Sequence, residues 1–186
     1  MIIAFTGAGI SSDSGIATFM ENHAIRDRLT RKFASENPEQ YRQTIAEMVD
    51  IVNQAGPNDA HYALKDYDID IITMNIDGLH EEAGSSPLLL HGELPKGEEL
   101  LYADSLWNKP VLYGDPAPNY GKALNKVNQL GEDDILLVIG ASRHTKIAVE
   151  IREIAHVNGA EILEIQEDAA FEVREVLEEL KTRGKL

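Results

Sequence analysis

Four mostly apolar runs divide the chain, and each has the length of a buried strand. They are Ile2–Phe5, Ile69–Thr73, Ile135–Ile139 and Glu161–Ile165. The stretch DILLVIG shows no alternation of polar and apolar residues, which favours strands covered on both faces, as in parallel sheets. Two shorter runs are weaker candidates: Leu88–Leu90 and Pro110–Tyr113.

Helical periodicity fills the intervals between these runs. In residues 38–56 the apolar positions recur at helical spacing and Gly56 provides a stop signal. Asn58 is a candidate N-cap for the next helix. The remaining helical segments are 58–67, 119–131, 145–159 and 168–186. The repeated order of strand and helix predicts a doubly wound α/β sheet.

Two segments interrupt this rhythm. Residues 20–37 are charged with a helical pattern, and residues 92–109 form a short polar insertion ahead of a candidate strand. We expect both to build a small module on top of the sheet.

Composition narrows the function classes. The 186 residues suffice for one sizeable domain, and a hydrophobic content of 43% predicts a packed core. With 17 Lys and Arg against 32 Asp and Glu, the net charge of -15 repels phosphate backbones, so we expect no nucleic acid partner. The same charge tolerates a basic peptide.

Cysteine is absent from the sequence, which excludes disulfides and thiolate metal sites and fits a cytoplasmic location. The first apolar run is short and lacks a basic leader, so we expect no signal peptide. The sequence also lacks a stretch of about 18 apolar residues, so we expect no membrane span.

The first apolar run ends in Thr6-Gly7-Ala8-Gly9. Glycines at a strand-to-helix turn let backbone N–H groups approach phosphate oxygens, which makes this turn a dinucleotide candidate. The usual fingerprint has a third glycine where Ser12 stands, and an acid after the second strand, where this chain has a helical insertion. A hydride-transferring dehydrogenase is therefore disfavoured, and a tight turn that binds nothing is the alternative.

Further polar residues follow other apolar runs. Asn75 and Asp77 follow Ile69–Thr73, at the sheet edge where open α/β folds bind ligands. They suit ligand hydroxyls, or else an Asx turn that caps a helix near Gly78. His91, next to Gly92, ends another apolar run and is a candidate acid or base.

Gly140 and Ser142 close the run Ile135–Ile139 as the glycines close the first run. They are candidates for contact with the other half of a dinucleotide.

Three motifs in this order resemble the sirtuin family of NAD-dependent protein deacylases: TGAGISSDSGI, TMNIDGLH and LHGE. Four further segments resemble parts of that family: AGPNDAHYAL, PVLYGDPAP, IGASRHTKIA and NGAEILEI. The resemblance implies an α/β fold with a Rossmann-like, doubly wound, mainly parallel sheet. It implies a single sirtuin-like domain over 1–186, with the core at 1–19, 50–92 and 110–186. The small helical module would then comprise 20–49 and 93–109.

The resemblance also implies roles for individual residues. Gly7, Ala8, Gly9, Ile10 and Ser11 would bind NAD phosphates and shape a nicotinamide pocket. Asn75 and Asp77 would hold the nicotinamide ribose, and His91 would be the general base. Gly140 and Ser142 would contact phosphate or adenosine ribose, and Phe19 and Gln166 would add cofactor contacts. The implied reaction transfers an acyl group from a lysine peptide to ADP-ribose and releases nicotinamide.

The sequence departs from the family pattern at several positions. Ala17-Thr18-Phe19-Met20 stands where the family has Pro-Asp-Phe-Arg, Met74 replaces a Gln, and Gln166 replaces an Asn. These losses of polar contacts leave two alternatives open: an NAD hydrolase or ADP-ribosyltransferase, and a non-catalytic protein that binds NAD or ADP-ribose.

The four cysteines of the family's structural zinc ribbon are also missing. The reduced module is therefore expected to pack through Trp107, Leu106 and Tyr102, with Trp107 in a local core.

Overall fold

A computed structural model of the chain describes residues 1–16 and 23–186. Within these ranges, five parallel strands form one sheet in the order β3-β2-β1-β4-β5. The strands are β1 Ile2–Thr6, β2 Asp70–Thr73, β3 Leu88–Leu89, β4 Ile135–Ile139 and β5 Glu161–Ile165. The four main expected strands and the weaker one near Leu88 are thus confirmed, and the fold is Rossmann-like α/β.

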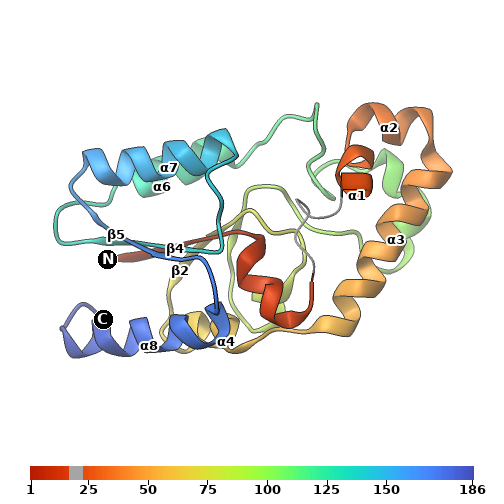
Figure 1. Ribbon diagram of the computed structural model, residues 1–186. Coiled ribbons are helices and arrows are strands. Elements are labelled where there is room, and N and C mark those ends of the chain that lie inside the picture. Colours follow the sequence, from red (N-terminus) through yellow and green to blue (C-terminus); the bar gives the residue numbers. More distant parts are fainter. Residues whose placement is uncertain (17–22) are drawn as a thin grey trace.

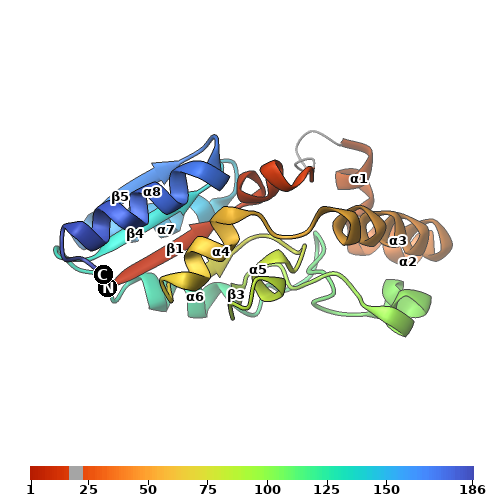
Figure 2. The ribbon, with the colours of Figure 1, turned by 90° about the horizontal axis from the view of Figure 1, so that it is seen from below.

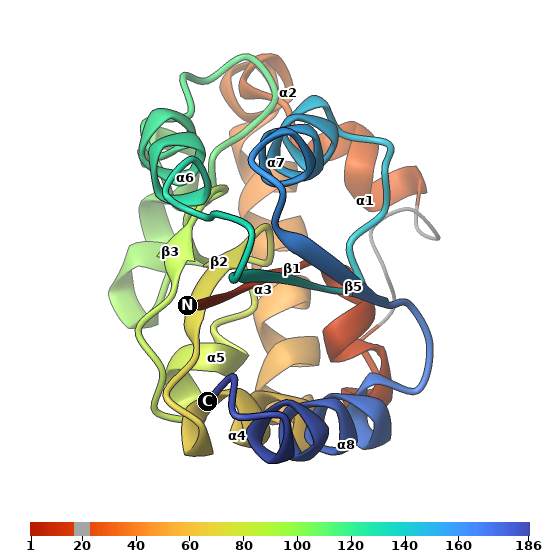
Figure 3. The ribbon, with the colours of Figure 1, turned by 90° about the vertical axis from the view of Figure 1, so that its left-hand side faces the viewer.

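Helices cover both faces of this sheet (Figures 1 and 3). One face packs against α4 (Asp59–Asp66) and α8 (Ala169–Thr182), and the other against α6 (Tyr120–Val127) and α7 (Lys146–Val157). Along β1, Ile2 and Ala4 belong to the first of these two cores, whereas Ile3 and Phe5 belong to the second. Burial of alternate residues on opposite faces explains why the strands read as unbroken apolar runs.

The strand order reverses at β1, which has β2 on one side and β4 on the other. In open α/β sheets, ligands bind outside the carboxyl ends of the strands at this reversal point. Two connections lie there: the 3₁₀ helix η1 (Ala8–Ser14), which follows β1, and the turn after β4.

A group of helices lies beyond the carboxyl ends of the strands (Figures 1 and 2). Their side chains contribute to a third buried cluster. It joins α1 (His23–Arg28), α2 (Arg31–Glu36), α3 (Pro38–Ala55) and η2 (Gly97–Ser105). We call this group the small module. Its buried members include Tyr41, Ile45 and Met48 of α3, which pack with Leu94, Ala103 and Leu112.

Two expectations about this region are wrong. Residues 110–113 do not join the sheet, because Tyr113 instead forms an isolated parallel bridge with Thr30. Trp107 is not in a local core: it is 58% exposed, and Tyr102 is 47% exposed. The module packs instead through the buried cluster that contains Tyr41 and Ile45, and its boundaries within the chain stay a prediction.

No helix in the described ranges is long and apolar enough to cross a membrane.

Candidate functional site

The glycines after β1 pack directly against the turn after β4. A Cβ atom on Gly9 would lie 2.5 Å from Gly140 Cα, and one on Gly7 would lie 2.7 Å from Ala141 Cα. The Gly9 N–H donates a hydrogen bond to Gly140 O over 2.9 Å, and the Gly7 N–H donates to Ile139 O over 3.0 Å. Close approach of the chain's own backbone therefore requires these glycines, whatever ligand binds nearby.

Three predicted site residues meet at this edge of the sheet. Ser11 Oγ donates to Asp77 Oδ2 over 2.7 Å, and Asn75 Nδ2 donates to Ser11 Oγ over 3.2 Å. The second carboxylate oxygen of Asp77 accepts from the N–H of Leu79, the first residue of α5 (Leu79–Glu82), over 3.0 Å. Asp77 thus caps α5 as the Asx alternative proposed, and it also belongs to a polar cluster with Ser11 and Asn75.

The side chain of Asn58 connects η1 to the start of α4. As expected, its side chain caps α4 by accepting from the Ala60 N–H over 3.0 Å. Its amide also donates to Ile10 O over 2.7 Å and to Ser14 Oγ over 3.1 Å. The Ile10 side chain is fully buried in the core on the α4 and α8 face. The segment that carries Ser11 is therefore held rigidly at both its backbone and its side chains.

His91 lies between a backbone carbonyl and a hydroxyl group. Its Nδ1 is 3.0 Å from Met74 O, and its Nε2 is 2.8 Å from the Tyr120 hydroxyl. A carbonyl oxygen only accepts, so Nδ1 carries the proton and Nε2 accepts from Tyr120 when the ring is neutral. Burial lowers the pKa of His91, opposed by the bond to Met74. The ring is therefore neutral at physiological pH, with a basic Nε2.

His91 and Tyr120 line a cavity of about 530 Å³. Its other walls include Met74 and the segment Tyr113–Asp115, and the basic residues Arg26 and Lys146 also line it. Arg26 is paired with Asp27 and Lys146 with Glu150, and Asp115 also lines the cavity, so the charges on its wall are mixed. The cavity is large enough for a small-molecule ligand.

The space beside Gly92 is not open to such a ligand. A Cβ atom there would lie 2.0 Å from Asn108 O, so the glycine next to His91 is required by the neighbouring loop.

Two buried histidines contact each other, and one of them reaches the carboxyl end of β1. Thr6 Oγ1 donates to Thr73 Oγ1 over 2.8 Å and is 3.0 Å from His80 Nε2. The His80 ring lies edge-on to that of His61, with centroids 4.9 Å apart. Burial lowers the pKa of His61 to about 4, and burial together with His61 lowers the pKa of His80 to about 3. Both rings are therefore neutral parts of the fold.

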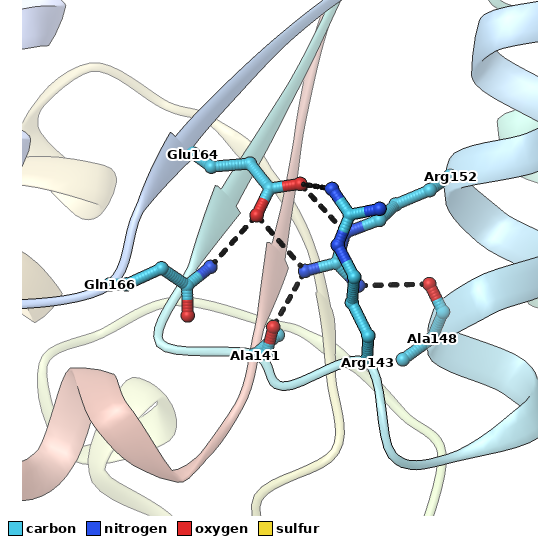
Figure 4. A network of polar contacts seen from close by, with 6 residues as sticks. All are labelled: Ala141, Arg143, Ala148, Arg152, Glu164 and Gln166. Atoms are coloured by element: carbon cyan, nitrogen blue, oxygen red, sulfur yellow. Dashed lines mark hydrogen bonds and ion pairs between the residues drawn. The ribbon is translucent and has the colours of Figure 1, made fainter.

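A network of charged residues braces the turn after β4 (Figure 4). Arg152 of α7 is only 5% exposed, and it donates to Ala141 O over 2.6 Å and to Glu164 of β5 over 3.0 Å. Arg143 and Gln166 also donate to Glu164, over 2.6 Å and 3.1 Å. Gln166 is thus oriented by Glu164, and the backbone next to Gly140 is held by Arg152.

The other predicted site residues are placed as follows. Ala8 is partly exposed at the start of η1, and Ser142 is exposed in the turn after β4. Phe19 lies outside the residues that the structure describes, as do the departures at Thr18 and Met20.

The chain is similar in sequence to proteins of one known family. A sequence model of the Sir2 family matches residues 7–98. An NAD-dependent protein deacylase of Thermococcus sibiricus is 32% identical over an alignment of 209 positions, which covers 88% of this chain and 79% of that protein. The chain belongs to the Sir2 family. A second NAD-dependent protein deacylase, from Helicobacter pylori, is 32% identical over an alignment of 189 positions, which covers 83% of this chain and 80% of that protein.

Solved Sir2 structures show the same fold. A crystal structure of a Sir2 homolog–NAD complex matches with a TM-score of 0.80 at 23% identity, covering 98% of this chain and 90% of that one. A structure of Sir2Tm bound to a propionylated peptide matches with a TM-score of 0.76 at 24% identity, covering 96% and 92%.

Two residues that shape this candidate site were not predicted from the sequence. Tyr120 reads as the first residue of an amphipathic helix, and Arg152 reads as a polar position within another. Their contacts join segments far apart in the chain, so only the folded arrangement reveals them. The motifs, by contrast, are local and were found.

Proposed function

We propose that this Sir2-family chain is an NAD-dependent protein-lysine deacylase, which transfers the acyl group to ADP-ribose and releases nicotinamide. Relatives that are 32% identical carry the name NAD-dependent protein deacylase. Related folds have been solved with NAD and with a propionylated peptide. The observation that carries the proposal is His91, a neutral base held in one tautomer on the wall of a cavity large enough for substrate.

His91 is the general base in this proposal. Its Nδ1 proton is committed to Met74 O, so the lone pair on Nε2 is directed to the Tyr120 hydroxyl in the cavity. A substrate hydroxyl that replaces the Tyr120 contact would give its proton to Nε2. General-base assistance of this kind contributes about 10²- to 10⁴-fold to a rate.

The cluster of Ser11, Asn75 and Asp77 fits the ribose and nicotinamide side of NAD. It offers a hydroxyl, an amide and a carboxylate at the strand-order reversal, where open α/β sheets bind dinucleotides. Asp77 contributes a negative charge whose two oxygens are held by Ser11 and the Leu79 N–H. NAD, when bound, supplies the ribose carbon that takes the acyl oxygen as nicotinamide leaves.

The remaining cofactor contacts are proposals of the same kind. They comprise Gly7, Ala8, Gly9, Ile10, Phe19, Gly140, Ser142 and Gln166. Because the Gly7 and Gly9 N–H groups are bonded to the turn after β4, we assign these glycines to shaping the NAD surface. The cytoplasmic location also stays a prediction from the sequence.

The test is to incubate the protein with NAD, with and without an acetyl-lysine peptide, and to measure nicotinamide and the acylated product by mass spectrometry. We expect peptide-dependent nicotinamide release. Release that needs no peptide would replace deacylation by NAD hydrolysis, and thermal stabilisation by NAD without turnover would leave a binding protein. His91→Ala should abolish turnover while NAD still raises the melting temperature.

A further inference from the structure

Arg31 occupies the centre of the small module. Its Nε and Nη2 atoms donate to the two oxygens of Asp115 over 2.8 Å and 2.7 Å. Its Nη1 donates to Asp104 O over 2.9 Å, and its Nη2 also donates to Leu106 O over 2.8 Å. The guanidinium also lies 4.5 Å from the centre of the Trp107 ring. One side chain of α2 therefore binds both η2 with its following loop and the segment that contains Asp115.

This pair is shielded from water. The Arg31 side chain is 18% exposed and the Asp115 side chain is 1% exposed. Burial alone would raise the pKa of Asp115, but the bonds from Arg31 and from the Leu112 N–H hold that pKa below its usual range. Loss of the guanidinium would leave a buried carboxylate without its charged partner, which proteins tolerate poorly.

The backbone repeats the connection that the side chains make. The Arg31 N–H donates to Tyr113 O over 2.9 Å, and the Tyr113 N–H donates to Leu29 O over 3.0 Å. Asp115 also accepts from the N–H of Leu112 over 3.2 Å. Residues 111–115 are thus held at the start of α2 by the backbone bonds of Tyr113 and by the ion pair between Arg31 and Asp115.

The docked segment is a wall of the cavity that contains His91. Tyr113, Gly114 and Asp115 line this cavity, and the Val111 N–H donates to His91 O over 2.8 Å. Arg31 therefore helps to hold this wall of the cavity in place.

A zinc ribbon, which the sirtuin resemblance implies, does not fit this module. The sequence contains no cysteine. Over residues 1–16 and 23–186, no group of three or more His, Asp or Glu side chains is placed to hold a metal ion. Instead, Arg31 makes polar contacts that join α2 to η2 and to residues 111–115, beside the apolar packing of the module.

We propose that Arg31 is a positioning residue that organises the small module without metal and holds residues 111–115 as a wall of the cavity that contains His91. This inference rests on the proposed deacylase function for its kinetic consequence. Lysine carries a point charge and lacks the planar fork that binds both carboxylate oxygens. Arg31→Lys should therefore raise the KM for acetyl-lysine peptide at least tenfold, while the KM for NAD changes less than twofold.

The matched control is Arg42→Met. Arg42 of α3 also binds η2, through the Asp104 carboxylate over 2.5 Å, but within residues 1–16 and 23–186 it forms no hydrogen bond or ion pair with residues 111–115. This control should keep the peptide KM of the unchanged protein. A second variant, Arg31→Met, removes the guanidinium altogether. If it fails to fold, the double variant of Arg31→Met with Asp115→Asn also removes the charge of the carboxylate that is left without a partner. The double variant should regain its melting temperature but keep the raised peptide KM.

Hydrogen–deuterium exchange gives a readout that needs no activity. Arg31→Lys should speed exchange at the amides of residues 111–113 at least tenfold and leave β4 unchanged, whereas Arg42→Met should leave both unchanged. EDTA should not lower the melting temperature of the unchanged protein. Unaltered exchange and peptide KM in Arg31→Lys, or a melting temperature lowered by EDTA, would overturn the inference. If the wild-type protein shows no turnover, the deacylase proposal fails. The hydrogen–deuterium exchange of the variants would still test the role of Arg31.

Discussion

His91 has both ring nitrogens engaged, one by the Met74 carbonyl and the other by the Tyr120 hydroxyl. The two contacts have opposite effects on protonation. The carbonyl stabilises a ring with a proton on Nδ1 in either charge state, whereas the hydroxyl donates only to the neutral form. Tyr120 therefore helps to keep His91 in the form that a base requires.

The pH dependence of kcat/KM tests this reasoning. Because burial lowers the pKa of His91 below 6.5, the acid limb of the unchanged enzyme should fall only below that pH. Tyr120→Phe removes the donor to the neutral ring, so the pKa should rise and the acid limb should move upward by about 0.4–1.1 pH units. Tyr62→Phe, at an exposed tyrosine of α4, should not move it. An acid limb that stays in place in Tyr120→Phe would show that this hydroxyl does not hold the base neutral.

At the scale of single residues, local motifs indicate the residues of the candidate site but not the residues that hold them in place. Ser11, Asn75, Asp77 and His91 stand in short motifs directly after apolar runs, so a local pattern identifies them. Arg31 gives no such signal, because its carboxylate partner is 84 positions away. The side chains that hold a site come from distant segments, and their pairing exists only in three dimensions.

Among the secondary-structure elements, the contact between η1 and the turn after β4 imposes the strictest geometry. Gly140 has a φ of +55°, and a Cβ atom there would lie 2.4 Å from the Gly9 carbonyl carbon and Cα. Both the backbone conformation and the neighbouring chain exclude a side chain.

Gly140→Ala should therefore lower the free energy of unfolding by roughly 3 kcal/mol, because overpacking and a strained backbone act together. Urea unfolding measures this change. Gly121→Ala is the matched control: no atom lies within 4 Å of its added Cβ, and the residue is in α6. That substitution should stabilise the helix by about 0.5–1 kcal/mol. Equal stability of the two variants would contradict the packing argument.

The elements themselves followed from the sequence where burial was complete. β1 and β4 are covered on both faces, so their unbroken apolar runs identified them with almost the right ends. The similar run at residues 110–113 was wrongly predicted as a strand, because its Leu112 packs in the small module rather than in the sheet. Periodicity reports that a segment is buried, but it does not report which partner buries it.

For the molecule as a whole, the buried pair of His61 and His80 links stability to pH. The unfolded chain binds protons at these residues below about pH 6.5, whereas the folded pKa values are about 4 for His61 and about 3 for His80. Between these limits the unfolded state holds more protons, so stability is complete above pH 6.5 and is lost as the pH falls.

Urea unfolding at pH 7, 6 and 5 measures the effect. From pH 6.5 to pH 5 the free energy of unfolding should fall by up to about 2 kcal/mol for each buried histidine. His80→Gln should flatten this dependence, whereas His156→Gln, at an exposed position near the end of α7, should not. A stability that does not change over this range would show that the pair titrates normally.

The edge strand β5 affects the tendency of copies of the molecule to associate through their sheets. A strand at the border of a sheet exposes backbone groups onto which a foreign strand can add. Here two of its five residues are glutamates, and arginines hold both in place: Arg183 pairs with Glu161, and Arg152 and Arg143 pair with Glu164. The brace that orients Gln166 thus also keeps fixed charge along an open border, where it discourages self-association into extended aggregates.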